Sequence, residues 1–169
     1  MFYNIDKMEE GHTNEGSNAV KWMDLLLNTS SIFNNLDINY QDRLGATVLH
    51  YLAMIPGPDS LKIFENLIQN GADFTIEDKE KNNVIHYSIK YNNVNITKFL
   101  LNNYKDKILE VKDLNGYNLL TYCIQKYSWE CLSEVVDLMG SQILEIEDEN
   151  AEATPSKFAK KIGFEEFYK

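Results

Sequence analysis

The chain has little of several features that would assign it to a familiar class. It holds only two cysteines, Cys123 and Cys131, too few for a disulfide framework, so we expect both to be free, buried thiols in a reducing compartment. No apolar run approaches the roughly 20 residues that span a bilayer. The acidic first residues also lack the apolar stretch of a secretory signal. The sequence therefore predicts neither a membrane segment nor export.

Basic residues are also scarce. The chain has 16 lysines and arginines against 26 acidic residues, which gives a net charge of −10. Proteins that bind nucleic acids present clustered positive charge to the phosphates, so this balance argues against that class. It favours a protein partner that carries a basic segment. We expect most of the carboxylates to lie in solvated loops.

Residues that could perform catalysis or hold a metal are few and scattered. The chain has three histidines, and it contains no phosphate loop, Gly-x-Gly-x-x-Gly, His-Glu-x-x-His or EF-hand loop. The two cysteines lack partners at metal-ligand spacing. Acidic residues in loops form an acid–base pair only where their environment separates their pKa values. We therefore predict no catalytic residue, no cofactor and no metal.

Residues 42–73 form one supersecondary unit. Gly45 opens a turn, because glycine tolerates a positive φ, and Thr47 can cap a short helix. A second amphipathic helix follows, which we expect Asp59 or Ser60 to cap and a glycine at position 71 to end. Such a unit cannot bury its apolar faces alone and therefore predicts stacked neighbours.

The neighbours are visible as a repeat of 35 or 36 residues. In the second unit we expect helices over 83–91 and 94–103, and in the third over 118–126 and 129–139. The positions that recur at these shifts are Asp42, Asp78 and Asp113; His50 and His86; and Tyr87 and Tyr122.

Two signatures carry a family resemblance. Thr47-Val48-Leu49-His50 with Ala53, and Asn70-Gly71-Ala72-Asp73, resemble the Thr-Pro-Leu-His-x-Ala and Gly-Ala-Asp patterns of the ankyrin repeat. The resemblance implies an all-α solenoid of helix-turn-helix units joined by finger loops. It also implies that His50 and His86 tie fingers to short helices rather than bind a metal. The second unit departs from the family at Lys81, where glycine is preferred.

The repeat register divides the chain. We expect residues 1–16 to form a flexible N-terminal tail and residues 17–169 to form a single ankyrin-repeat domain. The domain would comprise a degenerate cap at 17–41, full repeats at 42–77, 78–112 and 113–147, and a truncated repeat at 148–169.

The resemblance also implies where a partner would bind. Stacked units form a concave face from the finger tips and the exposed side of the short helices. The family's partner-contacting positions fall on Leu44, Met54, Ile55, Glu80, Tyr91, Leu114, Tyr117 and Lys126. We expect the apolar members of this set to be exposed, since apolar clusters on a surface mark interaction sites. Acidic residues of the fingers would form the rim, namely Glu77, Asp78, Glu80, Glu145, Glu147 and Asp148.

The function expected from these features is non-catalytic binding of a protein. Small ankyrin proteins with few additions resemble the viral inhibitor-of-kappaB mimics called vankyrins, which implies host–virus interaction and inhibition of a Rel/NF-kappaB factor through its basic segment. The alternative is a generic adaptor or scaffold, for example a substrate-recruiting subunit of a ubiquitin ligase. We expect a cytoplasmic monomer, with the nucleus as a second compartment, and no contact with nucleic acid or membrane. The sequence alone does not specify which protein is bound.

Overall fold

The computed structural model describes residues 37–139 together with Pro155 and Lys157. Short and long helices alternate along the chain. They are α3 (Val48–Ala53), α4 (Pro58–Gln69), α5 (Val84–Lys90), α6 (Val94–Leu109), α7 (Leu119–Lys126) and α8 (Trp129–Met139). Between residues 37 and 139 the only β-type pairing is an isolated bridge from Lys112 to Asn118. The predicted all-α solenoid is confirmed.

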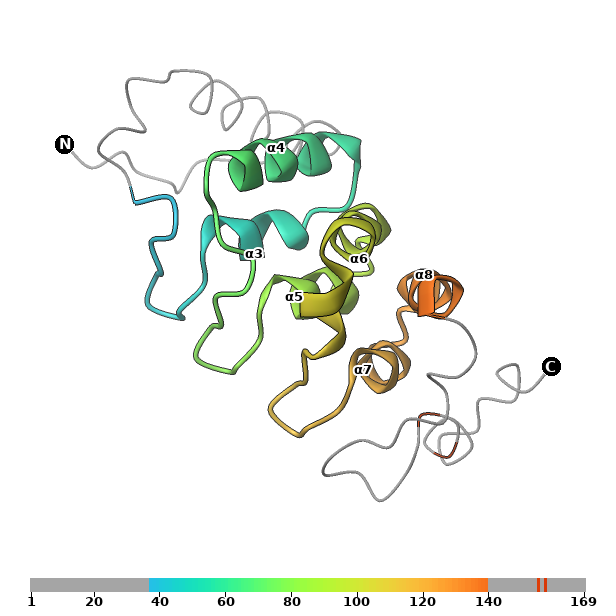
Figure 1. Ribbon diagram of the computed structural model, residues 1–169. Coiled ribbons are helices and arrows are strands. Elements are labelled where there is room, and N and C mark those ends of the chain that lie inside the picture. The colour runs from blue at the N-terminus through green and yellow to red at the C-terminus, as the bar shows by residue number, and fades with distance from the viewer. Residues whose placement is uncertain (1–36, 140–154, 156, 158–169) are drawn as a thin grey trace, which may run out of the picture.

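The helices form two layers. The short helices α3, α5 and α7 form one row, the long helices α4, α6 and α8 form a second row above it in the view, and the finger loops project from the side of the short helices (Figure 1). Each short helix contacts the long helix that follows it, and each helix contacts its counterpart in the next unit. The units therefore bury their apolar faces against one another, as stacked repeats require.

Each short helix begins at a polar residue, as the sequence predicts. The backbone amide of Thr47 donates to Nδ1 of His50 at 3.0 Å, and that of Asn83 donates to Nδ1 of His86 at 3.1 Å. The side chain of Asn118 instead accepts from the backbone amide three residues further on, at 3.0 Å. Polar groups at these ends satisfy backbone donors that the helices leave open.

The start of α4 differs from the prediction. The N-cap is Gly57 and Pro58 is the first helical residue, so neither Asp59 nor Ser60 caps the helix. Proline suits that position because its missing N–H has no helical acceptor to bond. Ser60 is buried, and its hydroxyl donates back to the carbonyl of Gly57 at 2.9 Å. The predicted stop is confirmed, since Gly71 follows the helix with a φ of +93°.

The helix that we expected to end at Asn103 is interrupted there, because Tyr104 has a non-helical φ of −136° and ψ of 30°. A further helical segment, which was not predicted, follows to Leu109. No glycine follows Asn103 to supply the left-handed residue that ends α4. The ring of Tyr104 packs against that of Phe74 with centroids 4.6 Å apart, and the extra turn buries Ile108 completely. These contacts hold the segment after Asn103 against the stack.

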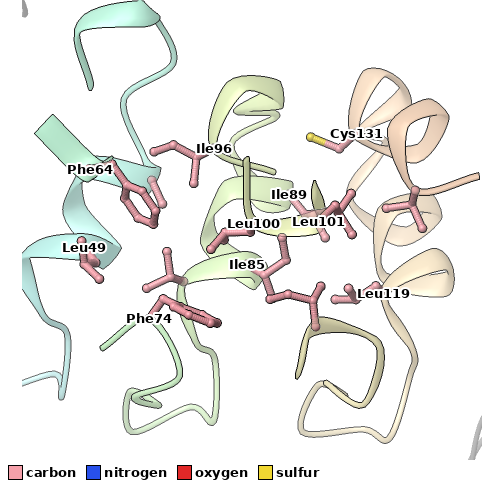
Figure 2. Close-up of a cluster of buried hydrophobic side chains, with 14 of the residues drawn as sticks. Leu49, Phe64, Phe74, Ile85, Ile89, Ile96, Leu100, Leu101, Leu119 and Cys131 are labelled. Carbon is pink, nitrogen blue, oxygen red and sulfur yellow. The ribbon is translucent and has the colours of Figure 1, made fainter. Parts of the chain in front are cut away.

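One hydrophobic core runs through the described units, between the two layers (Figure 2). Its largest fully buried side chains include Leu49, Phe64, Ile85, Ile89, Ile96, Leu100, Leu101 and Leu120. Cys123 and Cys131 belong to this core as free thiols, which confirms the prediction for both. Burial raises the pKa of Cys123 and raises that of Cys131 to about 11, so both remain protonated.

Polar side chains connect consecutive units at the ends of the short helices. The side-chain amide of Asn93, at the N-cap of α6, donates to the carbonyls of Ala53 at 3.2 Å and Ile55 at 3.0 Å. The hydroxyl of Ser128, directly before α8, donates to the carbonyl of Ile89. These carbonyls belong to the C-terminal turns of α3 and α5, so each is satisfied by the following unit.

Several predictions fall outside the described residues. They are the tail at 1–16, nearly all of the cap at 17–41, the acidic finger with Glu145, Glu147 and Asp148, and most of the truncated repeat. Of that last repeat, Pro155 and Lys157 are described and both are helical. None of the described helices combines the length and the apolar character needed to cross a membrane.

Candidate protein-binding surface

Each described finger is built around one aspartate. Oδ1 of Asp42 accepts the backbone amides two and four residues on, at 2.8 and 2.9 Å. Asp78 makes the same pair of bonds at 2.8 and 2.9 Å, and Asp113 makes both at 2.9 Å. Asp78 is buried and is an exception to the expectation that most carboxylates lie in solvated loops. The repeated aspartate organises each turn because its carboxylate replaces missing backbone acceptors.

Neighbouring fingers are bonded directly to one another. The backbone amide of Lys79 donates to the carbonyl of Leu44 at 2.9 Å, and Nε2 of Gln41 donates to the carbonyl of Glu77 at 3.0 Å. The approach is close because Gly45 has no Cβ: an added Cβ would lie 2.9 Å from the nitrogen of Lys79. The first two fingers therefore present their tips in a fixed arrangement.

The short helices carry a row of tyrosines, which we call the tyrosine row, and two of its members bond to the fingers. It consists of Tyr51, Tyr87 and Tyr122, which occupy equivalent positions in the three units. The hydroxyl of Tyr51 donates to Oδ2 of Asp42, and that of Tyr87 donates to Oδ2 of Asp78 at 2.8 Å. The hydrogen bond from Tyr51 lowers the pKa of Asp42, which is therefore ionised at neutral pH.

Histidines fill the spaces between these rings. His50 meets Tyr87 edge to face with centroids 5.0 Å apart, and His86 meets Tyr122 in the same way at 5.0 Å. Since Nδ1 of His50 accepts a backbone amide, the proton lies on Nε2, which donates to the carbonyl of Asn82 at 3.2 Å. The predicted structural tie between His50 and a finger is confirmed, and the finger is that of the next unit.

His86 repeats only half of this arrangement. Its Nδ1 is bonded to Asn83, but its buried Nε2 has no hydrogen-bond partner. Burial lowers the pKa of His86 to about 4, and burial likewise lowers the pKa of His50. Both rings are therefore neutral at pH 7. Among the described residues, no group of His, Cys, Asp and Glu side chains is placed to hold a metal ion.

We define the finger face as the finger residues 42–46, 78–82 and 113–117 with the exposed side of α3, α5 and α7. Of the residues predicted to contact a partner, Leu44 is 64% exposed, Leu114 is 69% exposed and Tyr91 is 38% exposed. Glu80 and Lys126 are exposed as well. These residues are available to a partner, as predicted.

Three other predicted contact residues are less available. Met54, Ile55 and Tyr117 are half-buried, so the expectation that they are exposed is wrong. Met54 is the C-cap of α3 and Ile55 follows it, and Asn93 at the start of α6 donates a hydrogen bond to the carbonyl of Ile55. The backbone of Tyr117 folds back onto Asp113 within its finger. Local interactions of the stack therefore cover part of each side chain.

Other exposed aromatic residues were not predicted. Tyr51 is 45% exposed on the finger face. At the loop between α7 and α8, Tyr127 and Trp129 are exposed and their rings meet edge to face at 5.8 Å. Tyr127 adopts a φ of +56°, which is uncommon for a residue with a side chain. The repeat register could have found Tyr51, since it aligns with Tyr87 and Tyr122.

Comparison with protein families agrees with this geometry. A family model described as ankyrin repeats in three copies matches residues 49–147. A search of curated protein sequences returned no match.

Proposed function

The chain belongs to the ankyrin-repeat family, whose members serve as protein-binding modules, and from that premise we propose that it inhibits a Rel/NF-kappaB factor as the inhibitor-of-kappaB proteins do. The inhibitor would bind through the finger face and act by occupying a basic segment of its partner. It would function as a monomer in the cytoplasm and the nucleus.

The observation that carries the proposal is the composition of the finger face. Leu44, Tyr51, Tyr91 and Leu114 present apolar and aromatic surface. Glu80 on the second finger and Glu77 directly before that finger are exposed. An apolar centre with a charged rim is a common construction of specific interfaces. The net charge of −10 favours a basic partner, because long-range attraction speeds their encounter.

The test is binding of the purified chain to a purified Rel-type dimer, measured by surface plasmon resonance. We expect saturable binding that weakens when the basic segment of the dimer is deleted. Tyr91→Ala should weaken it by about 2 kcal/mol, or roughly 30-fold, mainly through faster dissociation, if Tyr91 anchors the interface. Asn102→Ala is the matched control, since Asn102 is exposed on α6 in the opposite layer.

Two results would overturn the proposal. Binding that survives Tyr91→Ala and is lost in Asn102→Ala would place the interface on the long helices. No binding to Rel dimers, together with specific recovery of a ubiquitin ligase component from host cells, would favour the adaptor function instead. The monomeric state is checked separately by light scattering on the purified chain.

A further inference from the structure

Two members of the tyrosine row lie beside a lysine of their own chain. Nζ of Lys90 lies 5.9 Å from the ring centroid of Tyr87 and 5.7 Å from that of Tyr91. Nζ of Lys126 lies 5.0 Å from the centroid of Tyr122. A cation within about 6 Å of a tyrosine ring is attracted by its negative face. In the second and third units the ring of the tyrosine row therefore attracts a lysine side chain of the same helix.

Helix geometry explains these two pairs. Lys90 follows Tyr87 by three residues and Lys126 follows Tyr122 by four, which places each lysine on the same helix face as its ring. The corresponding positions after Tyr51 hold Met54 and Ile55, which carry no charge. The first unit thus keeps the ring but lacks the lysine.

Tyr51 is also the most accessible ring of the row. It is exposed, whereas Tyr87 is half-buried and Tyr122 is buried. Among the described residues, no lysine or arginine lies over its ring. Its hydroxyl is bonded to the carboxylate of Asp42, which adds a full negative charge at the edge of the ring. The exposed Leu44 donates its backbone amide to the same carboxylate.

We propose that Tyr51 and Asp42 form a binding site for one lysine or arginine side chain of a partner protein, in the place that Lys90 and Lys126 take in the other two units. The ring would hold the cation, and Leu44 would contact its aliphatic stem. Asp42 already accepts three hydrogen bonds, so it has room for about one more donor and cannot form a bidentate pair with arginine. The proposal rests on the proposed role of the finger face in protein binding and adds the chemistry of one contact.

The first test uses small probes and needs no known partner. The labelled protein is titrated with N-acetyl-arginine amide, N-acetyl-lysine amide and the uncharged N-acetyl-citrulline amide while the ring signals of Tyr51 are followed by NMR. We expect both cations to shift these signals at least three-fold more than citrulline at equal concentration. Equal shifts with citrulline would overturn the proposal.

Two reciprocal variants provide the control. Met54→Lys copies the second unit by placing a lysine three residues after Tyr51, and it should reduce the cation-induced shift at least five-fold. Lys90→Met copies the first unit, and it should leave the response of Tyr51 unchanged. Lys90 is exposed and Met54 is half-buried at the C-cap of α3, so melting curves of both variants are recorded, and only variants that melt close to wild type are compared. A full response in Met54→Lys would overturn the proposal.

A second test separates this site from the proposed function. Random peptides are selected on the immobilised protein, and binders are then compared on wild type and Met54→Lys. We expect a basic residue at one position and at least ten-fold weaker binding to the variant. Binders to the finger face with no basic preference and no sensitivity to Met54→Lys would reject the cation site and leave the protein-binding function. A cation response at Tyr51 without any peptide or protein binder would reject the function and leave the site.

Discussion

The contact between the first two fingers predicts a large effect of a small substitution. Gly45 has a φ of +82°, and an alanine Cβ at this position would lie 2.9 Å from the backbone nitrogen of Lys79 and 3.1 Å from Cα of Asp78. Backbone atoms cannot rotate away as a flexible side chain can. Gly45→Ala should therefore strain the first finger and separate it from the second.

The magnitude follows from two contributions. A residue with a Cβ in the left-handed region costs about 1–2 kcal/mol. Relief of the close contact would break the hydrogen bond from Lys79 to Leu44, which contributes about 1 kcal/mol. We expect a loss of about 2–3 kcal/mol in the free energy of unfolding.

The assay is urea and thermal unfolding followed by circular dichroism, with a lowered midpoint as the expected result. The matched control is Lys81→Gly at the equivalent position of the second finger, where the chain has a lysine at a φ of +63°. That change should stabilise by about 0.5–1 kcal/mol, after the small loss of the exposed ion pair between Lys81 and Glu77. If Gly45→Ala melts within about one degree of wild type, the described contact between fingers is wrong.

Three further predictions concern charge and the histidines. The folded state holds His86 neutral with a pKa of about 4, below the ordinary 6.5, so the unfolded chain binds an extra proton as the pH falls. The stability that depends on a neutral His86 is therefore fully present above pH 6.5 and falls by about 3 kcal/mol as the pH is lowered toward 4. The free energy of unfolding of His86→Gln should depend less on pH over that range. His50→Ala should cost about 1–2 kcal/mol in chemical denaturation, because Asn82 and Thr47 lose a partner, and a variant as stable as wild type would contradict the tie. Reversal of Glu77 and Glu80 to lysine should slow association with a basic partner and flatten its dependence on salt, whereas a change confined to dissociation in stopped-flow measurements would refute electrostatic steering.

Local signals made much of the fold predictable. Thr47 and Asn83 begin helices, Gly45 and Gly71 take positive φ, and each of these roles depends on a few adjacent residues. The helical segment that follows the kink at Tyr104 was not predictable in that way. It depends on packing of Tyr104 against a residue 30 positions earlier in the chain, which no local pattern reports.

The finger face was predicted in outline but not in its details. Carrying positions over from the family found exposed residues such as Leu44 and Leu114. It failed for Met54 and Ile55 because their exposure depends on the loop of the following unit. It also passed over Tyr51, whose importance depends on its bond to Asp42 and on the uncharged residues that follow it.

The hydrogen bonds from Asn93 and Ser128 give the stack a direction. Carbonyls at the ends of α3 and α5 accept hydrogen bonds from the unit that follows each of them. During synthesis on the ribosome, the end of α3 stays incomplete until Asn93 has emerged, about 40 residues later. The end of α5 likewise stays incomplete until Ser128 has emerged. The hydrogen bonds at these two helix ends are therefore complete only when the next unit is in place, and in a nascent chain halted between Ile55 and Asn93 the carbonyls at the end of α3 are left to solvent.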